Sequence, residues 1–462
     1  MSLTVSVEEL KPGMFVHLDL GWWAHPFALS SFLLSSQEQI DTIRGLGLKS
    51  LRISPEKSQR LAPAQPADGP AAPACTAQAG PAPADAAGPV PDPAAAPAAA
   101  PAAAANQIAV VATPGPATAL PAGATAPALA AQRLAQQVCE RQYQEAGQAW
   151  YAAQAALADA PQQALVITAG LARSLLDKMM VDGEMCVRVL SGVSGDPIAG
   201  HATNVAVISL LMARVFGFGT DDLLDVGVGA LLHDVGKADL PERARQPDGR
   251  NPADQTLYRS HVALGVAQGR RMGLSEGALA VLAQHHEMVD GSGFPNALNL
   301  DRMSTAARIV SLVNRYDKLC NPPHSAHSMT PHEALSAMFA QSRTKFDATM
   351  LNAFIRMMGV YPPGSLVQLT DDRYASVVSC NSSRPLKPKV LVCDVRVPVD
   401  DALLLNLDGQ ADLGIRRSLK AAQLPAAVRD YLSPRPRMVY FFEPVAPLPA
   451  PCVLAQSSVR AA

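Results

Sequence analysis

The stretch DLLDVGVGALLHDVGK, residues 222–237, decides the class of the central part of this chain. Its apolar positions predict a helix that ends at His233-Asp234, with Gly236 placed to stop it and Lys237 just beyond. Adjacent His and Asp side chains at a helix end can converge on one metal ion, and the carboxylate can bridge to a second. The pair alone is weak evidence, because such dipeptides are common by chance.

More histidines stand on or beside predicted helices around this pair. Half of the chain's 10 histidines fall in its central region. The helix that begins at His201 carries Val205 and Ile208 on the same face, so the imidazole is expected to point to the interior. Gly265, four residues after His261, permits the close approach of a second helix.

Asp317 adds a carboxylate to RIVSLVNRYDKL, a helical stretch that is otherwise largely apolar on one face. A carboxylate on a buried face costs free energy unless it is paired or binds a metal. Five imidazoles and two carboxylates are therefore expected to converge. They are His201, His233, Asp234, His261, His285, His286 and Asp317.

This set of ligands predicts a binuclear metal centre. Nitrogen and oxygen donors without thiolate favour Mn, Fe, Co, Ni or Zn. Seven protein ligands exceed what one ion needs, so we expect two divalent transition-metal ions, Fe or Mn, that share a bridging carboxylate and a hydroxide. Such a pair lowers the pKa of the bridging water and orients it for in-line attack on phosphorus. Phosphate-ester hydrolysis is the reaction that suits this chemistry best.

The remaining sequence predicts a mainly α protein in four regions. Residues 1–58 form a small α+β domain, and residues 59–132 form an Ala/Pro-rich flexible linker whose prolines interrupt any helix. Residues 133–365 form an all-helical bundle with no convincing strand before Leu366. Residues 366–462 form a short β-rich extension. In the first region, His17, Trp22, Trp23 and His25 fit a small domain's core better than a binding surface.

Charge and composition exclude some classes of protein. The net charge of −2 provides no basic field, so neither DNA nor RNA is expected as a partner. No run of about 18 apolar residues and no signal-peptide order occurs, which predicts a cytoplasmic protein without membrane insertion. The 7 cysteines include no CxxC pair, so they are expected to be free thiols in a reducing compartment.

The order of these motifs resembles the HD-GYP subfamily of the HD metal-dependent phosphohydrolases across residues 180–358. The specific part is HHEMVDGSGFP, residues 285–295, in which Phe294 stands where the family has Tyr. The opening segment, VEELKPGMFVHLDLGWWAHPF through PEKS, resembles the N-terminal domain of unknown function often found ahead of HD-GYP domains.

The resemblance implies a cyclic di-GMP phosphodiesterase of bacterial second-messenger signalling. The product would be pGpG, with GMP open as a further product, and a two-metal-activated hydroxide would attack. By position, one metal would be held by His201, His233, Asp234 and Asp317, and the other by Asp234, His261, His285 and His286. Asp234 and Lys237 would be catalytic, with Lys237 near the scissile phosphate. The implied substrate-binding residues are Lys237, Asp290, Gly291, Gly293, Phe294 and Pro295.

The chain departs from the family at its phosphate-binding positions. The basic stretch that resembles RPYR becomes KLCNPPHSAHS, with Pro323 and Ala326 at the Arg positions, and KPG becomes QPDG at 246–249. Each charged hydrogen bond not replaced is expected to weaken phosphate binding by about 1 to 3 kcal/mol. Other cations near the site could substitute for them. The candidates are Arg308, Arg315 and Lys318.

Two further positions bear on the site. Some family members bind a third metal through a glutamate four residues before the first histidine, where this chain has Pro197, so a two-metal site is expected. Glu287 is expected to support the site rather than to bind metal. Two alternatives to a cyclic di-GMP phosphodiesterase stay open. The chain could be a low-activity module that keeps its metals and signals to other proteins, or a hydrolase of another nucleotide or phosphate ester.

Overall fold

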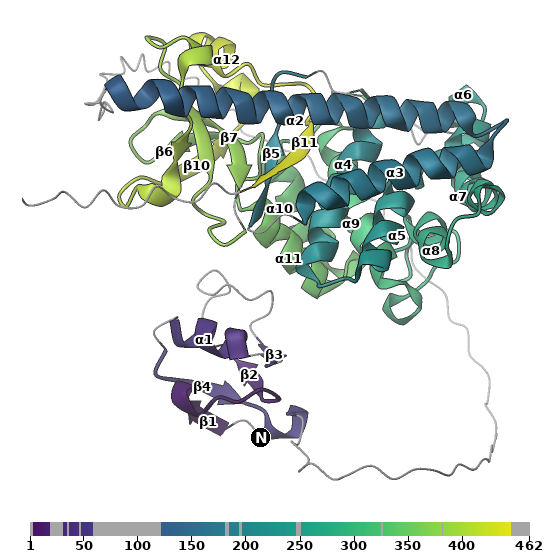
Figure 1. Ribbon diagram of the computed structural model, residues 1–462, viewed down its shortest axis with the longest axis horizontal. Helices are drawn as coiled ribbons and strands as arrows, with labels where there is room; N and C mark the ends of the chain where they lie inside the picture. Colours follow the sequence, from purple (N-terminus) through teal and green to yellow (C-terminus); the bar gives the residue numbers. More distant parts are fainter. Residues whose placement is uncertain are drawn as a thin grey trace, which may run out of the picture.

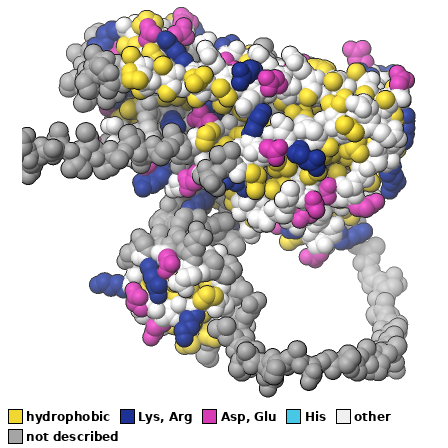
Figure 2. Space-filling model, viewed as in Figure 1, with side chains coloured by type: hydrophobic (Ala, Val, Ile, Leu, Met, Phe, Trp, Pro, Cys, Tyr) yellow, Lys and Arg dark blue, Asp and Glu magenta, His cyan; other side chains and the backbone are white. Residues whose placement is uncertain are grey.

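The computed structural model describes residues 3–18, 31–34, 37–45, 48–58, 122–180, 184–193, 196–245, 251–324, 327–380 and 382–444. Helices dominate these residues, and strands occur near both ends, so the expected mainly α fold is confirmed. None of the described helices combines the length and apolar character that a bilayer crossing demands. On the face drawn in Figure 2, acidic and basic side chains are interspersed, in keeping with the net charge of −2.

The N-terminal unit is a four-stranded antiparallel sheet in the order β1-β4-β2-β3, with one helix. Its elements are β1 (Leu3–Ser6), β2 (Phe15–His17), β3 (Ser31–Leu33), α1 (Gln37–Gly45) and β4 (Ser50–Ile53). Val16, Leu34, Ile40 and Ile43 are fully buried in its core. His17 contacts Ser54 through Nε2 and Oγ at 2.7 Å, whereas Trp22, Trp23 and His25 lie outside the described residues.

The helical part follows the predicted pattern of amphipathic segments (Figure 1). Its helices are α2 (Ala122–Ala156), α3 (Pro161–Met179), α4 (Ala199–Val215), α5 (Thr220–Leu232), α6 (Glu242–Arg245), α7 (Pro252–Met272), α8 (Glu276–Gln284), α9 (Thr305–Cys320), α10 (Pro331–Gln341) and α11 (Ala348–Met358). A short 3-10 helix, η3 (Val235–Asp239), follows α5.

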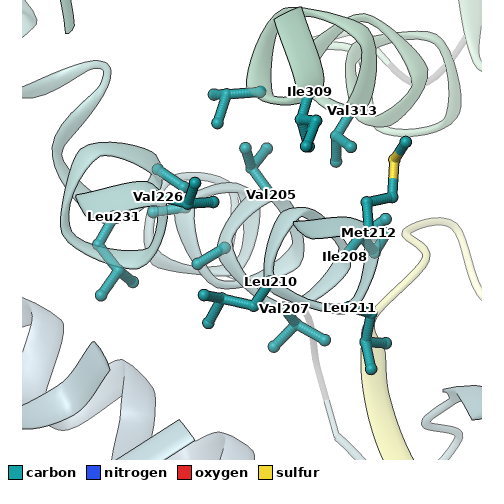
Figure 3. Packing of buried hydrophobic residues seen from close by; sticks show 14 of the residues in the cluster. Val205, Val207, Ile208, Leu210, Leu211, Met212, Val226, Leu231, Ile309 and Val313 are labelled. Carbon is teal, nitrogen blue, oxygen red and sulfur yellow. The ribbon is translucent and has the colours of Figure 1, made fainter. Parts of the chain in front are cut away.

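Helix α4 occupies the centre of the bundle. It is apolar nearly all round, as expected of a helix surrounded by others. Figure 3 shows Val205 and Ile208 of α4 beside Ile309 and Val313 of α9, with Val226 of α5 nearby. These side chains are all fully buried, so α4, α5 and α9 form a packed core from which the ends of the helices emerge.

Helix α2 begins at Ala122, which lies inside the expected linker of residues 59–132. The expected C-terminal boundary of the linker is therefore too far along the chain. An Ala-rich sequence favours a helix, and Pro127 near its start removes only one hydrogen bond. Contacts with the C-terminal part hold the beginning of α2, because Gln132 donates to Ala402 O at 3.0 Å and Arg133 pairs with Asp401 at 2.6 Å.

The C-terminal region belongs to a seven-stranded sheet whose main path is β10-β6-β7-β5-β11, with β8 beside β7 and β9 beside β8. Its elements are β5 (Met185–Val189), β6 (Leu366–Leu369), β7 (Tyr374–Cys380), β8 (Lys389–Val392), β9 (Leu405–Asn406), β10 (Ile415–Leu419) and β11 (Tyr440–Pro444), with helix α12 (Ala426–Leu432). The expected absence of strands before Leu366 is wrong, since β5 precedes α4 and pairs with β11. Tyr440 and Phe441 of β11 are buried in the same core as the bundle, so this sheet is integral to the domain.

Candidate metal centre

The ends and inner faces of four helices bring six of the seven candidate ligands together. His201 lies in the first turn of α4, His233-Asp234 follows α5, and His261 lies within α7. His285-His286 follows α8. Ligand atoms within 4.8 Å of one another form two groups, which share Asp234. The groups are Asp234, His261, His285 and His286, and His201, His233 and Asp234.

Backbone carbonyls set the orientation of three imidazoles. His233 Nδ1 lies 2.6 Å from Ala230 O, and His285 Nδ1 lies 2.9 Å from Leu282 O. His261 Nδ1 contacts the carbonyl of Tyr258 in the same way. At the ends of α5 and α8 these carbonyls have no partner within the helix, so the ring N–H groups satisfy them. The proton is thereby held on Nδ1, and the lone pair on Nε2 is left for a metal.

The Nε2 atoms converge in pairs. His201 Nε2 lies 3.1 Å from His233 Nε2, and His261 Nε2 lies 3.2 Å from His285 Nε2. Burial lowers the pKa of His261 to about 4 and lowers the pKa of His201 and His285 as well. Neutral imidazoles with facing lone pairs are arranged to bind cations rather than each other.

Asp234 lies between the two pairs. Its Oδ1 is 3.4 Å from His261 Nε2, and its Oδ2 is 3.3 Å from His233 Nε2. Oδ1 is buried and has no hydrogen-bond partner among the described residues. Although burial by itself would raise the pKa of this carboxyl, the charges of Lys237 and Lys318 hold it well below its ordinary value. An orphaned anionic oxygen among neutral imidazoles shows that the residues fit bound metal.

Asp317 lies outside the two groups and touches one of them. Its Oδ2 is 2.6 Å from His201 Nδ1, and its Oδ1 accepts hydrogen bonds from Asn204 at 2.8 Å and Asn321 at 2.9 Å. The carboxylate is fully buried and orients His201 in this arrangement. Its expected role as a direct metal ligand stays a prediction.

Asn204 and Asn321 tie this carboxylate to the C-terminal segment. Both side-chain amides donate to Met438 O at 2.9 Å. Met438 N donates to Asn321 Oδ1 at 2.7 Å, and Tyr440 N donates to Asn204 Oδ1 at 2.8 Å. The sequence interpretation missed both asparagines. Their positions one turn after His201 and one turn after Asp317 were the available signal.

Two glycines let the helix ends approach. A Cβ on Gly236 would lie 2.1 Å from His261 O and 2.4 Å from Gly265 N, so η3 rests directly on α7. The close approach expected at Gly265 is thus confirmed. Helix α5 ends at Leu232, ahead of Gly236, whose φ is not positive. Gly236 therefore serves close packing rather than the helix stop that its position suggested.

The loop 290–295 lies against His286. Phe294 stacks on the His286 ring with centroids 4.5 Å apart and planes at 20°. The buried Glu287 carboxylate accepts hydrogen bonds from Asn296 N at 2.7 Å and Leu298 N at 2.9 Å, so it fixes the loop and agrees with its expected supporting role. Within the loop, Asp290 Oδ1 accepts hydrogen bonds from the backbone and hydroxyl of Ser292.

The loop glycines have backbone roles. Gly291 has a φ of 79°, and a Cβ on Gly293 would lie 2.4 Å from the Cα of Glu287. Five of the implied substrate-binding residues lie in this loop. Among them, Phe294 is the one for which the described structure has a ring contact with a candidate ligand, His286. Substrate contacts of Asp290, Gly291, Gly293 and Pro295 stay predictions.

Lysines flank the centre, and a tyrosine joins them. Lys237 Nζ lies 2.6 Å from Asp234 Oδ2 and 5.2 Å from the centroid of Tyr258. The Tyr258 hydroxyl lies 3.3 Å from His286 Nε2 and 3.5 Å from Lys318 Nζ. Tyr258 was missed from sequence, although it stands one turn before His261 on α7.

The other basic positions lie elsewhere or are engaged. Arg308 pairs with Asp347 at 2.7 Å, and Arg315 is exposed. His324 and His327 are exposed after α9, whereas residues 246–249 and Ala326 are outside the described part of the chain.

The helical bundle and this set of donors, which could hold metal ions, are the features of an HD-type domain. The HD domain family model matches residues 193–350, and the model of the domain of unknown function DUF3391 matches residues 2–164. The chain is thus an HD-domain protein with an N-terminal DUF3391 domain, which confirms the resemblance seen in its motifs.

Several known proteins with similar sequences are named as phosphodiesterases of cyclic dinucleotides. A cyclic di-GMP phosphodiesterase of Pseudomonas aeruginosa is 28% identical over 222 residues, covering 46% of this chain and 52% of that protein. The 3′3′-cGAMP-specific phosphodiesterase 3 of Vibrio cholerae is 26% identical over 171 residues, covering 36% of each. The chain therefore spans about half or less of these relatives. An HDG"Y"P protein from Bdellovibrio bacteriovorus has a solved structure with a TM-score of 0.37 and 14% identity, covering 77% of this chain and 98% of that one.

Proposed function

We propose that this chain is a metal-dependent phosphodiesterase that hydrolyses cyclic di-GMP to pGpG. The observation that carries the proposal is the buried Asp234 Oδ1, which lies near His261 and His285 and has no hydrogen-bond partner among the described residues. The other oxygen of this carboxylate faces His201 and His233. A carboxylate so placed is suited to bridge two divalent cations. The names of the two curated relatives support a cyclic dinucleotide as the substrate class.

The two ligand groups would each hold one ion, with Fe or Mn expected. When bound, such ions supply the Lewis acidity and charge neutralisation that phosphate-ester hydrolysis requires. The chain's own part is to keep its imidazoles neutral by burial and to fix their Nε2 atoms by carbonyl contacts. Lys237 lies next to Asp234 at 2.6 Å, and its positive charge would stabilise the charge of a bound phosphate.

A turnover assay tests the proposal. The full chain, purified without oxygen and loaded with Mn or Fe, should convert cyclic di-GMP to pGpG, which chromatography resolves. The double variant His233→Ala/Asp234→Ala should lose turnover, because it removes one ligand and the shared carboxylate. His324→Ala, an exposed histidine outside both groups, should keep it. Absence of product with every metal tried would reject the proposal.

A second candidate function is a module that binds the nucleotide and turns it over poorly. Pro323 stands in the segment where a basic stretch was expected, and Lys237 is paired with Asp234 at 2.6 Å. Tight nucleotide binding without turnover in a metal-replete sample would favour this module. Turnover of 3′3′-cGAMP or another phosphate ester in place of cyclic di-GMP would favour the same chemistry on a different substrate.

A further inference from the structure

Lys318 is a partly buried cation at the edge of the metal centre. It follows Asp317 on α9, and its Nζ reaches across to the hydroxyl of Tyr258 on α7 at 3.5 Å. Among the described residues, no carboxylate forms an ion pair with it. Its charge acts on the Asp234 carboxylate only at longer range, whereas Lys237 pairs directly with Asp234 at 2.6 Å.

Tyr258 gives this lysine a fixed place. Its hydroxyl lies between Lys318 Nζ at 3.5 Å and His286 Nε2 at 3.3 Å. Its ring faces Lys237 at 5.2 Å and lies edge-on to Phe294 with centroids 6.4 Å apart. One side chain thus connects both lysines, a ligand histidine and the loop, so the two cations stand on one side of the centre.

Neither Arg308 nor the segment after α9 supplies this charge, and the exposed Arg259 lies over the Phe294 ring, 5.1 Å from its centroid. Arg308 is held by Asp347 at 2.7 Å, and the segment after α9 carries Pro323 and the exposed His324. A phosphodiester attached to the metal centre brings a negative oxygen that needs a donor at its open side. Lys318 has no ion-pair partner among the described residues, and the Tyr258 hydroxyl lies 3.5 Å from its Nζ at the edge of the centre.

We propose that Lys318, positioned by the Tyr258 hydroxyl, donates a charge-assisted hydrogen bond to a non-bridging oxygen of the substrate phosphodiester. This inference deepens the proposed function and rests on it for the identity of the substrate, while phosphate binding itself can be measured separately. A lysine on α9 thereby takes the place of the basic residues missing from the segment that follows.

The test measures binding of inorganic phosphate to the Mn-loaded full chain by calorimetry, together with KM for cyclic di-GMP. Lys318→Met should weaken phosphate affinity by roughly tenfold and raise KM similarly, with the metal content unchanged. Arg315→Met, an exposed neighbour on the same helix, is the matched control and should change neither value. Tyr258→Phe keeps the ring and removes the anchor, so a smaller loss in the same direction is expected.

Lys318→Arg separates charge from structure, because it should retain most of the phosphate affinity. Unchanged phosphate affinity in Lys318→Met, or a loss matched by falling metal content in both Lys318 variants, overturns the inference. The two proposals can fail separately. If cyclic di-GMP is not cleaved, the proposed substrate is wrong. If phosphate affinity nevertheless falls in Lys318→Met and not in Arg315→Met, the proposed role of Lys318 in phosphate binding is supported.

Discussion

Asp317 and His201 are joined by a hydrogen bond of 2.6 Å between Asp317 Oδ2 and His201 Nδ1. The carboxylate is held in turn by two asparagine amides, which also bond to the backbone of Met438. A continuous series of contacts thus runs from the C-terminal segment to a candidate ligand histidine. Because the proton on His201 Nδ1 faces Asp317, its Nε2 is presented to the neighbouring His233.

Removal of Asn204 should loosen this series without touching the ligands. Asn204→Ala deletes one donor to Asp317 and both contacts with the C-terminal backbone, so metal affinity is expected to fall by about 10- to 100-fold. Competition with a fluorescent chelator measures the affinity. Thr203→Val is the control, since this buried hydroxyl bonds only to its own helix at Ala199 O. Equal metal affinity in both variants would show that His201 needs no such support.

Gly236 should tolerate no side chain. Alanine there would place Cβ 2.1 Å from His261 O, which separates η3 from α7 and displaces Asp234 from His261. Gly236→Ala is expected to lower the free energy of unfolding by more than about 2 kcal/mol and to weaken metal binding. Gly170→Ala lies on α3 with open space around it and should instead raise stability by up to about 1 kcal/mol. Denaturant titration measures the free energy of unfolding of both variants. Similar changes in the two variants would contradict the close approach of η3 and α7 at Gly236.

The convergence of the candidate ligands could be predicted from sequence because its signals are local. A histidine at a helix end, such as His233 or His285, is placed by the helical period alone, and its partner carbonyl lies three residues earlier. The burial of Asp317 followed from the apolar residues around it. To predict that these groups converge, it was therefore enough to infer that the apolar faces of the helices pack together.

Features set by distant pairing were not predictable in this way. Strand β5 has five residues, and its partner β11 lies at the other end of the domain, so its local pattern carries little information. The roles of Asn204 and Tyr258 likewise depend on which residues another element brings opposite them. A buried amide or tyrosine on a helix is otherwise an ordinary core residue.

The pairing of β5 with β11 includes a buried ion pair that should be important for stability. Arg188 Nη1 lies 2.6 Å from Glu443 Oε2, and their side chains are 5% and 7% exposed. Glu443→Ala leaves a buried guanidinium without its partner, so the free energy of unfolding is expected to fall by about 3 to 5 kcal/mol. Asp394→Ala, which breaks the exposed pair with Arg396, should cost less than about 1 kcal/mol. Comparable losses in the two variants would argue against an integral C-terminal sheet.

Acid should destabilise the metal-free protein through the buried histidines. Burial lowers the pKa of His261 to about 4 and that of His286 well below its ordinary value. In the unfolded chain an imidazole binds its proton near pH 6.5. Above that pH neither state is protonated, and below it the unfolded state takes up protons that the folded state does not. The free energy of unfolding should therefore fall as the pH drops from about 6.5 to about 4, by up to about 3 kcal/mol for His261 alone.

Chelator-treated protein, unfolded by denaturant at a series of pH values from 8 to 5, measures this slope. His261→Gln cannot take up the proton in either state, so its dependence on pH should be shallower than that of the parent. His324→Ala removes an exposed imidazole and should leave the slope unchanged. Metal ions compete with protons for the same nitrogens, so added Mn should stabilise the protein more at pH 8 than at pH 5. A parent slope as shallow as that of His261→Gln would mean that His261 is protonated in the folded state, and the neutral-ligand arrangement would then be wrong.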